Sequence, residues 1–209
     1  VITAPDKPAG RGRKLNESAV KTFATSKGLR VLQPTNLKSP EFIKELQEIN
    51  PNVQVVVAFR MLPKIVWALP EYGTFNLHAS LLPNYRGAAP INWAIINGEK
   101  ITGVSTFFLD EKIDTGEIIL KKEVEINKDE NVGELHDKLM ETGAILVIET
   151  LNVIRNDNVI SHKQKLDGPY KEAPKLYKEN TRIDWKNSIF EIKDDKLREK
   201  IAAIDINNL

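Results

Sequence analysis

The stretch that decides the site is Asn76-Leu77-His78-Ala79-Ser80-Leu81-Leu82-Pro83. Tyr72-Gly73 before it has the composition of a turn, and the residues that follow predict a short strand. Side chains two apart on a strand point to the same face, so Asn76 and His78 should project together with Leu77 behind them. An isolated Asn-x-His would fit a simple strand cap. An amide donor beside an ionisable ring at a strand end also suits a reaction that builds negative charge on a carbonyl oxygen.

Helical and extended segments alternate along the rest of the chain. A continuous apolar run at residues 53–59 is typical of a strand buried on both faces of a parallel sheet. The alternation predicts an α/β fold, with a mainly parallel sheet and helices on both of its faces. Cap residues and apolar spacing predict helices over 16–27, 39–49, 63–69, 90–96 and 131–155, and further strands over 30–33, 74–78, 104–109 and 117–126.

Two of these helices carry specific expectations. Asn16 is expected to cap the first helix, and Ser39, followed by Pro40, the second. The long helix over 131–155 is amphipathic, and its apolar positions are expected to face inward: Leu135, Leu139, Ile145, Ile148 and Leu151.

Composition bounds the class of protein. The chain has 209 residues, 41% of them hydrophobic and 28% charged, which suits one sizeable core with a smaller appendage. It has no cysteine, which excludes disulfides and thiolate metal sites, and its three histidines lack zinc-site spacing. No apolar run reaches membrane-spanning length and no signal peptide is visible. We therefore expect a cytoplasmic, monomeric protein without a metal.

The net charge of +1 hides an uneven distribution. Residues 1–40 hold eight basic and two acidic side chains, a local excess of six positive charges. Many of these side chains fit an ordinary solvated surface. A Pro/Gly-rich loop differs because it can wrap around phosphates, and it carries Lys7, Arg11, Arg13 and Lys14.

Several motifs together resemble the folate-dependent formyltransferase family. They are the opening stretch, Tyr85-Arg86-Gly87-Ala88-Ala89-Pro90-Ile91, Thr102-Gly103-Val104 and Ile113-Asp114-Thr115-Gly116. The resemblance runs from Val1 to about Trp185. The basic block at residues 4–14 is most similar to the branch that formylates methionyl initiator tRNA.

The resemblance implies a Rossmann-like fold whose first strand and first helix are absent from this chain. It assigns residues 1–160 to a catalytic domain that is incomplete at its N-terminus. Residues 161–209 would be a linker and the start or remnant of a C-terminal region, which in the family is a β-barrel. The charged tail at 192–209 does not resemble the family.

The resemblance also implies roles. Asn76, His78 and Asp114 would be the catalytic trio, with 10-formyltetrahydrofolate as formyl donor and methionyl initiator tRNA as acceptor. The basic loop residues Lys7, Arg11, Arg13 and Lys14 would contact the tRNA. Two loops would bind the folate: Phe59, Arg60, Met61, Leu62 and Pro63, and Ser80, Leu81, Leu82 and Pro83. The first loop departs from the common family form, which has Tyr-Gly where this chain has Phe59-Arg60.

Two other functions fit the same residues. A sister formyltransferase acting on a small amine, such as a purine ribonucleotide precursor or an amino sugar, would use the same trio. A folate- or RNA-binding module without turnover would need the loops but not all three polar side chains.

Overall fold

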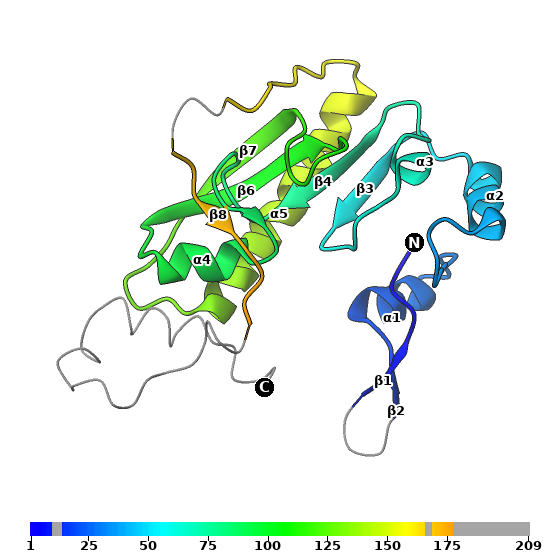
Figure 1. The fold of residues 1–209 in the computed structure, drawn as a ribbon, viewed down its shortest axis with the longest axis horizontal. Helices are drawn as coiled ribbons and strands as arrows, with labels where there is room; N and C mark the ends of the chain where they lie inside the picture. The colour runs from blue at the N-terminus through cyan, green and yellow to red at the C-terminus, as the bar shows by residue number, and fades with distance from the viewer. Residues whose placement is uncertain (10–13, 166–168, 178–209) are drawn as a thin grey trace. The chain divides into compact units, whose positions relative to one another are not determined.

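The computed structural model describes residues 1–9, 14–165 and 169–177 (Figure 1). Arg11, Arg13 and the tail at 192–209 therefore lie outside the described residues. The chain divides into two compact units, one of Val1–Asn52 with Met61–Glu71, the other of Val53–Arg60 with the chain from Tyr72 onward. The start of the chain and three helices belong to the first unit. The strand that carries Asn76 and His78 belongs to the second unit. In the parts of the chain that are described, no helix is both long enough and apolar enough to cross a bilayer.

The first unit contains a hairpin and three helices. Strand β1 (Lys7–Ala9) pairs antiparallel with β2 (Lys14–Asn16), and the helices are α1 (Ala19–Ser26), α2 (Pro40–Ile49) and α3 (Lys64–Trp67). The strand expected at 30–33 is reduced to a single parallel bridge between Ile2 and Leu32.

Of the two helix caps predicted in this unit, one is confirmed and one is wrong. Ser39 caps α2 by accepting a hydrogen bond from the Phe42 N–H at 3.3 Å, as expected. The expectation for Asn16 is wrong, because Asn16 ends β2 and Ser18 caps α1 by accepting from the Lys21 N–H at 3.2 Å. Both residues suit a cap, and the pairing of β2 with β1 decides between them.

The second unit is built on a four-stranded sheet. Its strands are β3 (Gln54–Val57), β4 (Thr74–His78), β6 (Ile101–Phe108) and β7 (Ile118–Glu125), in the order β3-β4-β6-β7. The α/β class is confirmed. The β3–β4 pair is parallel, but β4–β6 and β6–β7 are antiparallel, so the expectation of a mainly parallel sheet is wrong for these strands. A short connection joins β6 to β7, which requires the chain to reverse direction.

The apolar run at 53–59 also differs from expectation. Val55 is 40% exposed and Val57 is 55% exposed, so one face of β3 is open within its unit. A continuous apolar run indicates burial on both faces only where neighbouring elements cover both, and here one face alone is covered.

Helices α4 (Pro90–Ile96) and α5 (Val132–Arg155) pack together against one face of the sheet. Asn131 begins α5 with a capping box, its side chain accepting from the N–H groups of Gly133 and Glu134 while the Glu134 carboxylate accepts from the Asn131 N–H. The buried positions of α5 include Leu135, Leu139, Leu146, Thr150 and Ile154.

Two residues of α5 that were expected to face the core are exposed to solvent. Ile145 is 53% exposed and Ile148 is 58% exposed, because the buried stripe passes through Leu146 and Thr150 instead. Gly143 lies on that stripe and leaves room for Leu77, whose Cδ2 would lie 2.7 Å from a Cβ at position 143. Helix α5 therefore packs directly behind the strand that carries Asn76 and His78.

The connection from β6 to β7 depends on Gly116. A Cβ at this position would lie 1.6 Å from the backbone oxygen of Phe108, a contact that only a backbone shift could relieve. We expect Gly116→Ala to lower the free energy of unfolding by about 3 kcal/mol, measured by urea denaturation followed by circular dichroism.

Gly133→Ala is the matched control, since a Cβ there would approach only the Asn131 side chain, at 3.2 Å. Because that side chain can adjust, the change in urea midpoint should be much smaller than that of Gly116→Ala. Equal midpoints for Gly116→Ala and the unsubstituted protein would contradict this account of the turn.

Candidate active site

His78 ends β4 and is 7% exposed. Its Nε2 lies 2.7 Å from the backbone oxygen of Tyr85. A carbonyl oxygen can only accept a hydrogen bond, so Nε2 must carry the proton in the neutral ring. The ring also meets Phe107 edge to face, with centroids 6.5 Å apart. These contacts leave Nδ1 as the ring nitrogen that is turned toward Asp114.

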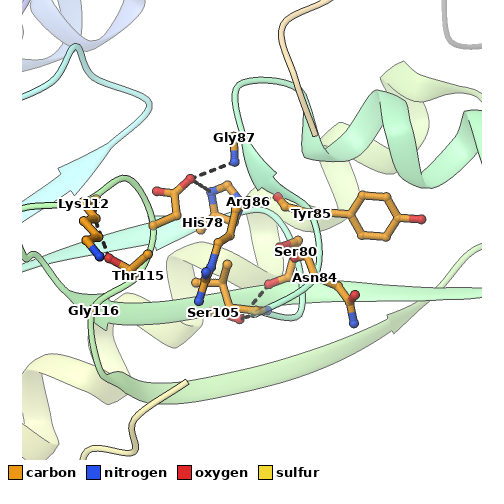
Figure 2. Close-up of polar contacts among 12 residues, drawn as sticks. His78, Ser80, Asn84, Tyr85, Arg86, Gly87, Ser105, Lys112, Thr115 and Gly116 are labelled. Atoms are coloured by element: carbon orange, nitrogen blue, oxygen red, sulfur yellow. Dashed lines mark hydrogen bonds and ion pairs between the residues drawn. The ribbon is translucent and has the colours of Figure 1, made fainter. Parts of the chain in front are cut away.

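Asp114 occupies the turn between β6 and β7. Its Oδ2 accepts a hydrogen bond from the Gly87 N–H at 2.9 Å and lies 3.9 Å from His78 Nδ1. In Figure 2, dashed lines from the labelled Gly87 and His78 meet at one oxygen of an unlabelled carboxylate, which is that of Asp114. The second distance is longer than a hydrogen bond, so the carboxylate faces the imidazole without bonding to it. The structure thus brings together His78 and Asp114, which are 36 residues apart in the sequence.

Asn76 lies two residues before His78 on the same strand, so the two side chains share a face of the sheet. Its partner across β6 is Phe107, which also touches the His78 ring. Leu77 points to the other face, toward α5. The amide and the imidazole therefore project from the same face of β4, as the sequence predicts.

The turn after β4 is held by hydrogen bonds to buried hydroxyls. Ser80 Oγ donates to the backbone oxygen of Asn84 at 2.7 Å. Ser105 Oγ donates to the backbone oxygen of Ser80 at 2.7 Å and accepts from the Leu82 N–H at 3.1 Å. Ser80 and Leu82 are fully buried. Their side chains therefore shape this turn, and the half-buried Leu81 and Pro83 form more of its surface.

The other expected folate loop is shared between the two units. Phe59 and Arg60 belong to the second unit, where the Arg60 guanidinium lies 5.6 Å from the Phe59 ring centroid. Met61, Leu62 and Pro63 belong to the first, and Met61 is 68% exposed. Their convergence with residues 80–83 on one pocket stays a prediction.

Two of the four expected RNA-binding residues fall on described strands of the first unit. Lys7 begins β1 and is exposed, and Lys14 begins β2 opposite Ala9. Arg11 and Arg13 lie between these strands, outside the described residues.

Two residues to which the sequence assigned no role contact His78 or Asp114. Tyr85 supplies the carbonyl that fixes the His78 ring, and it has the positive φ of 61°. Gln164 Nε2 donates to the backbone oxygens of Asp114 at 3.0 Å and Gly116 at 2.8 Å. A positive φ on tyrosine leaves no sequence signal, and Gln164 stands in an unremarkable polar stretch, so no local pattern could have identified either. In the described part of the chain, no three acidic or histidine side chains are grouped as a metal site would need.

The Tyr85 side chain anchors the turn from its other end. Its hydroxyl donates to the Glu99 carboxylate and accepts from Asn97 Nδ2 at 3.0 Å, and Lys171 pairs with the same carboxylate. Burial, together with the hydrogen bond to Glu99, raises the pKa of Tyr85 above its ordinary value of 10.0.

This shift predicts a loss of stability in alkali. Above pH 10 the unfolded chain ionises its tyrosines while Tyr85 in the folded chain stays protonated, so folding loses the stabilisation as pH rises. Below pH 10, Tyr85→Phe should lower the free energy of unfolding by about 1–2 kcal/mol, and the difference from the unsubstituted protein should shrink at higher pH.

Urea denaturation at a series of pH values measures both effects. Tyr72→Phe, at an exposed ring, should show neither. A pH-independent difference for Tyr85→Phe would contradict the assigned shift.

Comparisons with known proteins identify the relatives of this chain. Residues 1–151 match the family model described as formyl transferase. The chain is 62% identical over 192 residues to the methionyl-tRNA formyltransferase of Flavobacterium johnsoniae, covering 92% of this chain and 61% of that protein. The protein of the same name from Bacteroides thetaiotaomicron is 52% identical to this chain, over 93% of this chain and 61% of that protein. The chain thus spans about three fifths of the length of these relatives.

Solved structures show the same fold at low identity. HypX from Aquifex aeolicus, in complex with tetrahydrofolic acid, superposes with a TM-score of 0.68 at 22% identity, over 87% of this chain and 31% of that one. A sugar N-formyltransferase from a Shewanella species gives a TM-score of 0.68 at 19% identity, over 87% of this chain and 70% of that one. Because the family model covers residues 1–151, which are most of the sequence, the chain belongs to the formyl transferase family.

Proposed function

We propose that the protein containing this chain transfers a formyl group from 10-formyltetrahydrofolate to the α-amino group of methionyl initiator tRNA. The observation that carries the proposal is the placement of His78 between the Tyr85 carbonyl and the Asp114 carboxylate, on the strand face that it shares with Asn76. The relatives named methionyl-tRNA formyltransferase, at 50–62% identity, support this acceptor. The tetrahydrofolate in the HypX complex supports a folate donor.

The proposed reaction forms one C–N bond and breaks another. The amine nitrogen attacks the formyl carbon, whose oxygen becomes an oxyanion; the electron pair then returns and expels the folate N10. The proton that the amine loses is delivered to N10, so charge balances over the reaction.

The three side chains suit separate parts of this reaction. The Asn76 amide is a neutral donor for the oxyanion. His78 is the proton-transfer group, and since its Nε2–H is held by Tyr85, its Nδ1 is the nitrogen available to exchange a proton. Asp114, 3.9 Å from Nδ1, stabilises the imidazolium as it forms.

The folate and the tRNA would use the remaining predicted residues. Residues 59–63 and 80–83 would line the pterin pocket, the second loop contributing mainly its backbone and the side chains of Leu81 and Pro83, since Ser80 and Leu82 are buried. The basic segment with Lys7, Arg11, Arg13 and Lys14 would bind phosphates of the tRNA.

A transfer assay with two acceptors tests the proposal. With 10-formyltetrahydrofolate as donor, charged initiator tRNA should be formylated, and an amino sugar nucleotide or purine ribonucleotide precursor should not. Transfer to the small amine alone would favour the sister activity. Folate binding without transfer to any acceptor would favour a non-catalytic module.

Removing the catalytic side chains should abolish most turnover. We expect Asn76→Ala and His78→Ala each to lower kcat by about 100-fold or more, because each removes a group that acts on the transition state. The measurement is steady-state formylation of charged tRNA, with circular dichroism to confirm folding.

Asn92→Ala, a half-buried asparagine on α4, is the matched control and should keep kcat within about twofold. Near-normal turnover in Asn76→Ala or His78→Ala would remove that residue from the reaction.

Removing the positive charges of the basic loop should weaken the binding of tRNA but not the binding of folate. We expect Arg11→Ala/Arg13→Ala to raise the KM for charged tRNA and to flatten its dependence on log salt concentration by roughly one unit per lost phosphate contact. The KM for the folate should not change.

Lys44→Ala/Lys64→Ala removes the same charge from exposed helix positions of the first unit and serves as control. An unchanged salt slope in the arginine variant would make the loop an ordinary solvated surface and favour a small amine as acceptor.

A further inference from the structure

A segment beyond the family-model match completes the site. The match ends at residue 151, whereas residues 161–165 and 169–174, called the strap here, return to the catalytic loops. His162 bridges to Ile118 on β7 through two backbone hydrogen bonds of 2.9 Å. Strand β8 (Glu172–Ala173) then pairs in parallel with β5 (Arg86–Gly87). In Figure 1, β8 is the orange segment beside α4.

The strap holds the loop at residues 84–89 along its length. The Tyr85 N–H donates to the Lys171 oxygen at 2.6 Å, and the Ala89 N–H donates to the Ala173 oxygen at 3.1 Å. The Trp93 indole donates to the Pro174 oxygen at 2.7 Å. This loop supplies both the carbonyl that binds His78 and the Gly87 N–H that binds Asp114.

Gln164 joins that loop to the Asp114 turn through both ends of its carboxamide. Nε2 donates to the Asp114 and Gly116 oxygens, and Oε1 accepts from Arg86 Nε at 3.1 Å and Nη2 at 2.5 Å. Two donors and two acceptor sites are all that a carboxamide has, so every one is used. Arg86 is further fixed by the Tyr170 ring of the strap, 5.7 Å from its guanidinium carbon.

These hydrogen bonds hold the Asp114 turn and its carboxylate from two sides. Asp114 is held from its backbone by Gln164 and from its side chain by Gly87, and Gln164 also holds Arg86, the neighbour of Gly87 in the chain. We propose that Gln164 is a positioning residue, which sets the place of the Asp114 carboxylate relative to His78 Nδ1. The expected effect on rate rests on the proposed function; the effect on the His78 ring does not.

A purely structural role for Gln164 would lower stability without altering His78. The test therefore combines kinetics with the ¹⁵N chemical shift of His78 Nδ1, which reports the charge and proton at that atom. Gln164→Leu keeps the size of the side chain and removes all four hydrogen bonds. Gln164→Glu keeps an acceptor for Arg86 and removes the donors to Asp114 and Gly116.

We expect both variants to lower kcat by about 10- to 100-fold, since a displacement of about 1 Å at a reacting group has effects of this size. The KM for the folate should stay within about twofold. In both, the Nδ1 shift should move in the direction seen in Asp114→Asn. Lys165→Ala, an exposed neighbour in the strap, should change neither quantity.

An unchanged Nδ1 shift in Gln164→Leu and Gln164→Glu would overturn the proposal, whatever happens to stability. If Gln164→Leu is unfolded by circular dichroism, Gln164→Asn, which keeps both polar groups one methylene further from their partners, provides the same comparison. If the unsubstituted protein transfers no formyl group, the proposed function fails, and the Nδ1 shift still decides whether Gln164 positions the pair.

Discussion

The hydrogen bond from His78 to the Tyr85 carbonyl is the contact on which the arrangement of this site depends. It fixes the ring, assigns the proton to Nε2 and directs Nδ1 toward Asp114. The neighbouring structure serves the same geometry: Leu77 packs into the space left by Gly143 of α5, and Phe107 covers the ring edge. The positions of Leu77 and His78 on the two faces of β4 are thus fixed by the core on one side and by one backbone carbonyl on the other.

Keeping this geometry requires unfavourable backbone conformations at two of its members. Asp114 has a φ of 53° and Tyr85 a φ of 61°, the left-handed region that costs a non-glycine residue about 1–3 kcal/mol. Tertiary hydrogen bonds offset this conformational cost at both residues. Asp114 bonds to Gln164 and Gly87, and Tyr85 bonds to Lys171 and Glu99. Strain concentrated beside an ionisable pair is consistent with a site shaped for function rather than for stability.

The sequence predicted what depends on local pattern. The period-two spacing placed Asn76 and His78 on one face, and cap chemistry placed Ser39 and the helix at 90–96 correctly. What depends on distant partners was missed: the direction of β6, the buried stripe of α5 through Leu146, and the roles of Tyr85 and Gln164. Gln164 reaches Asp114 across 50 residues of chain, and nothing near it in the sequence distinguishes it from a solvated glutamine.

The most direct test of the central geometry is the tautomer of His78 in the folded protein, read from the ¹⁵N chemical shifts of its two ring nitrogens. We expect the neutral ring to carry its proton on Nε2, hydrogen-bonded to the Tyr85 carbonyl, with Nδ1 unprotonated. A neutral ring protonated on Nδ1, or an equal mixture of the two tautomers, would contradict it.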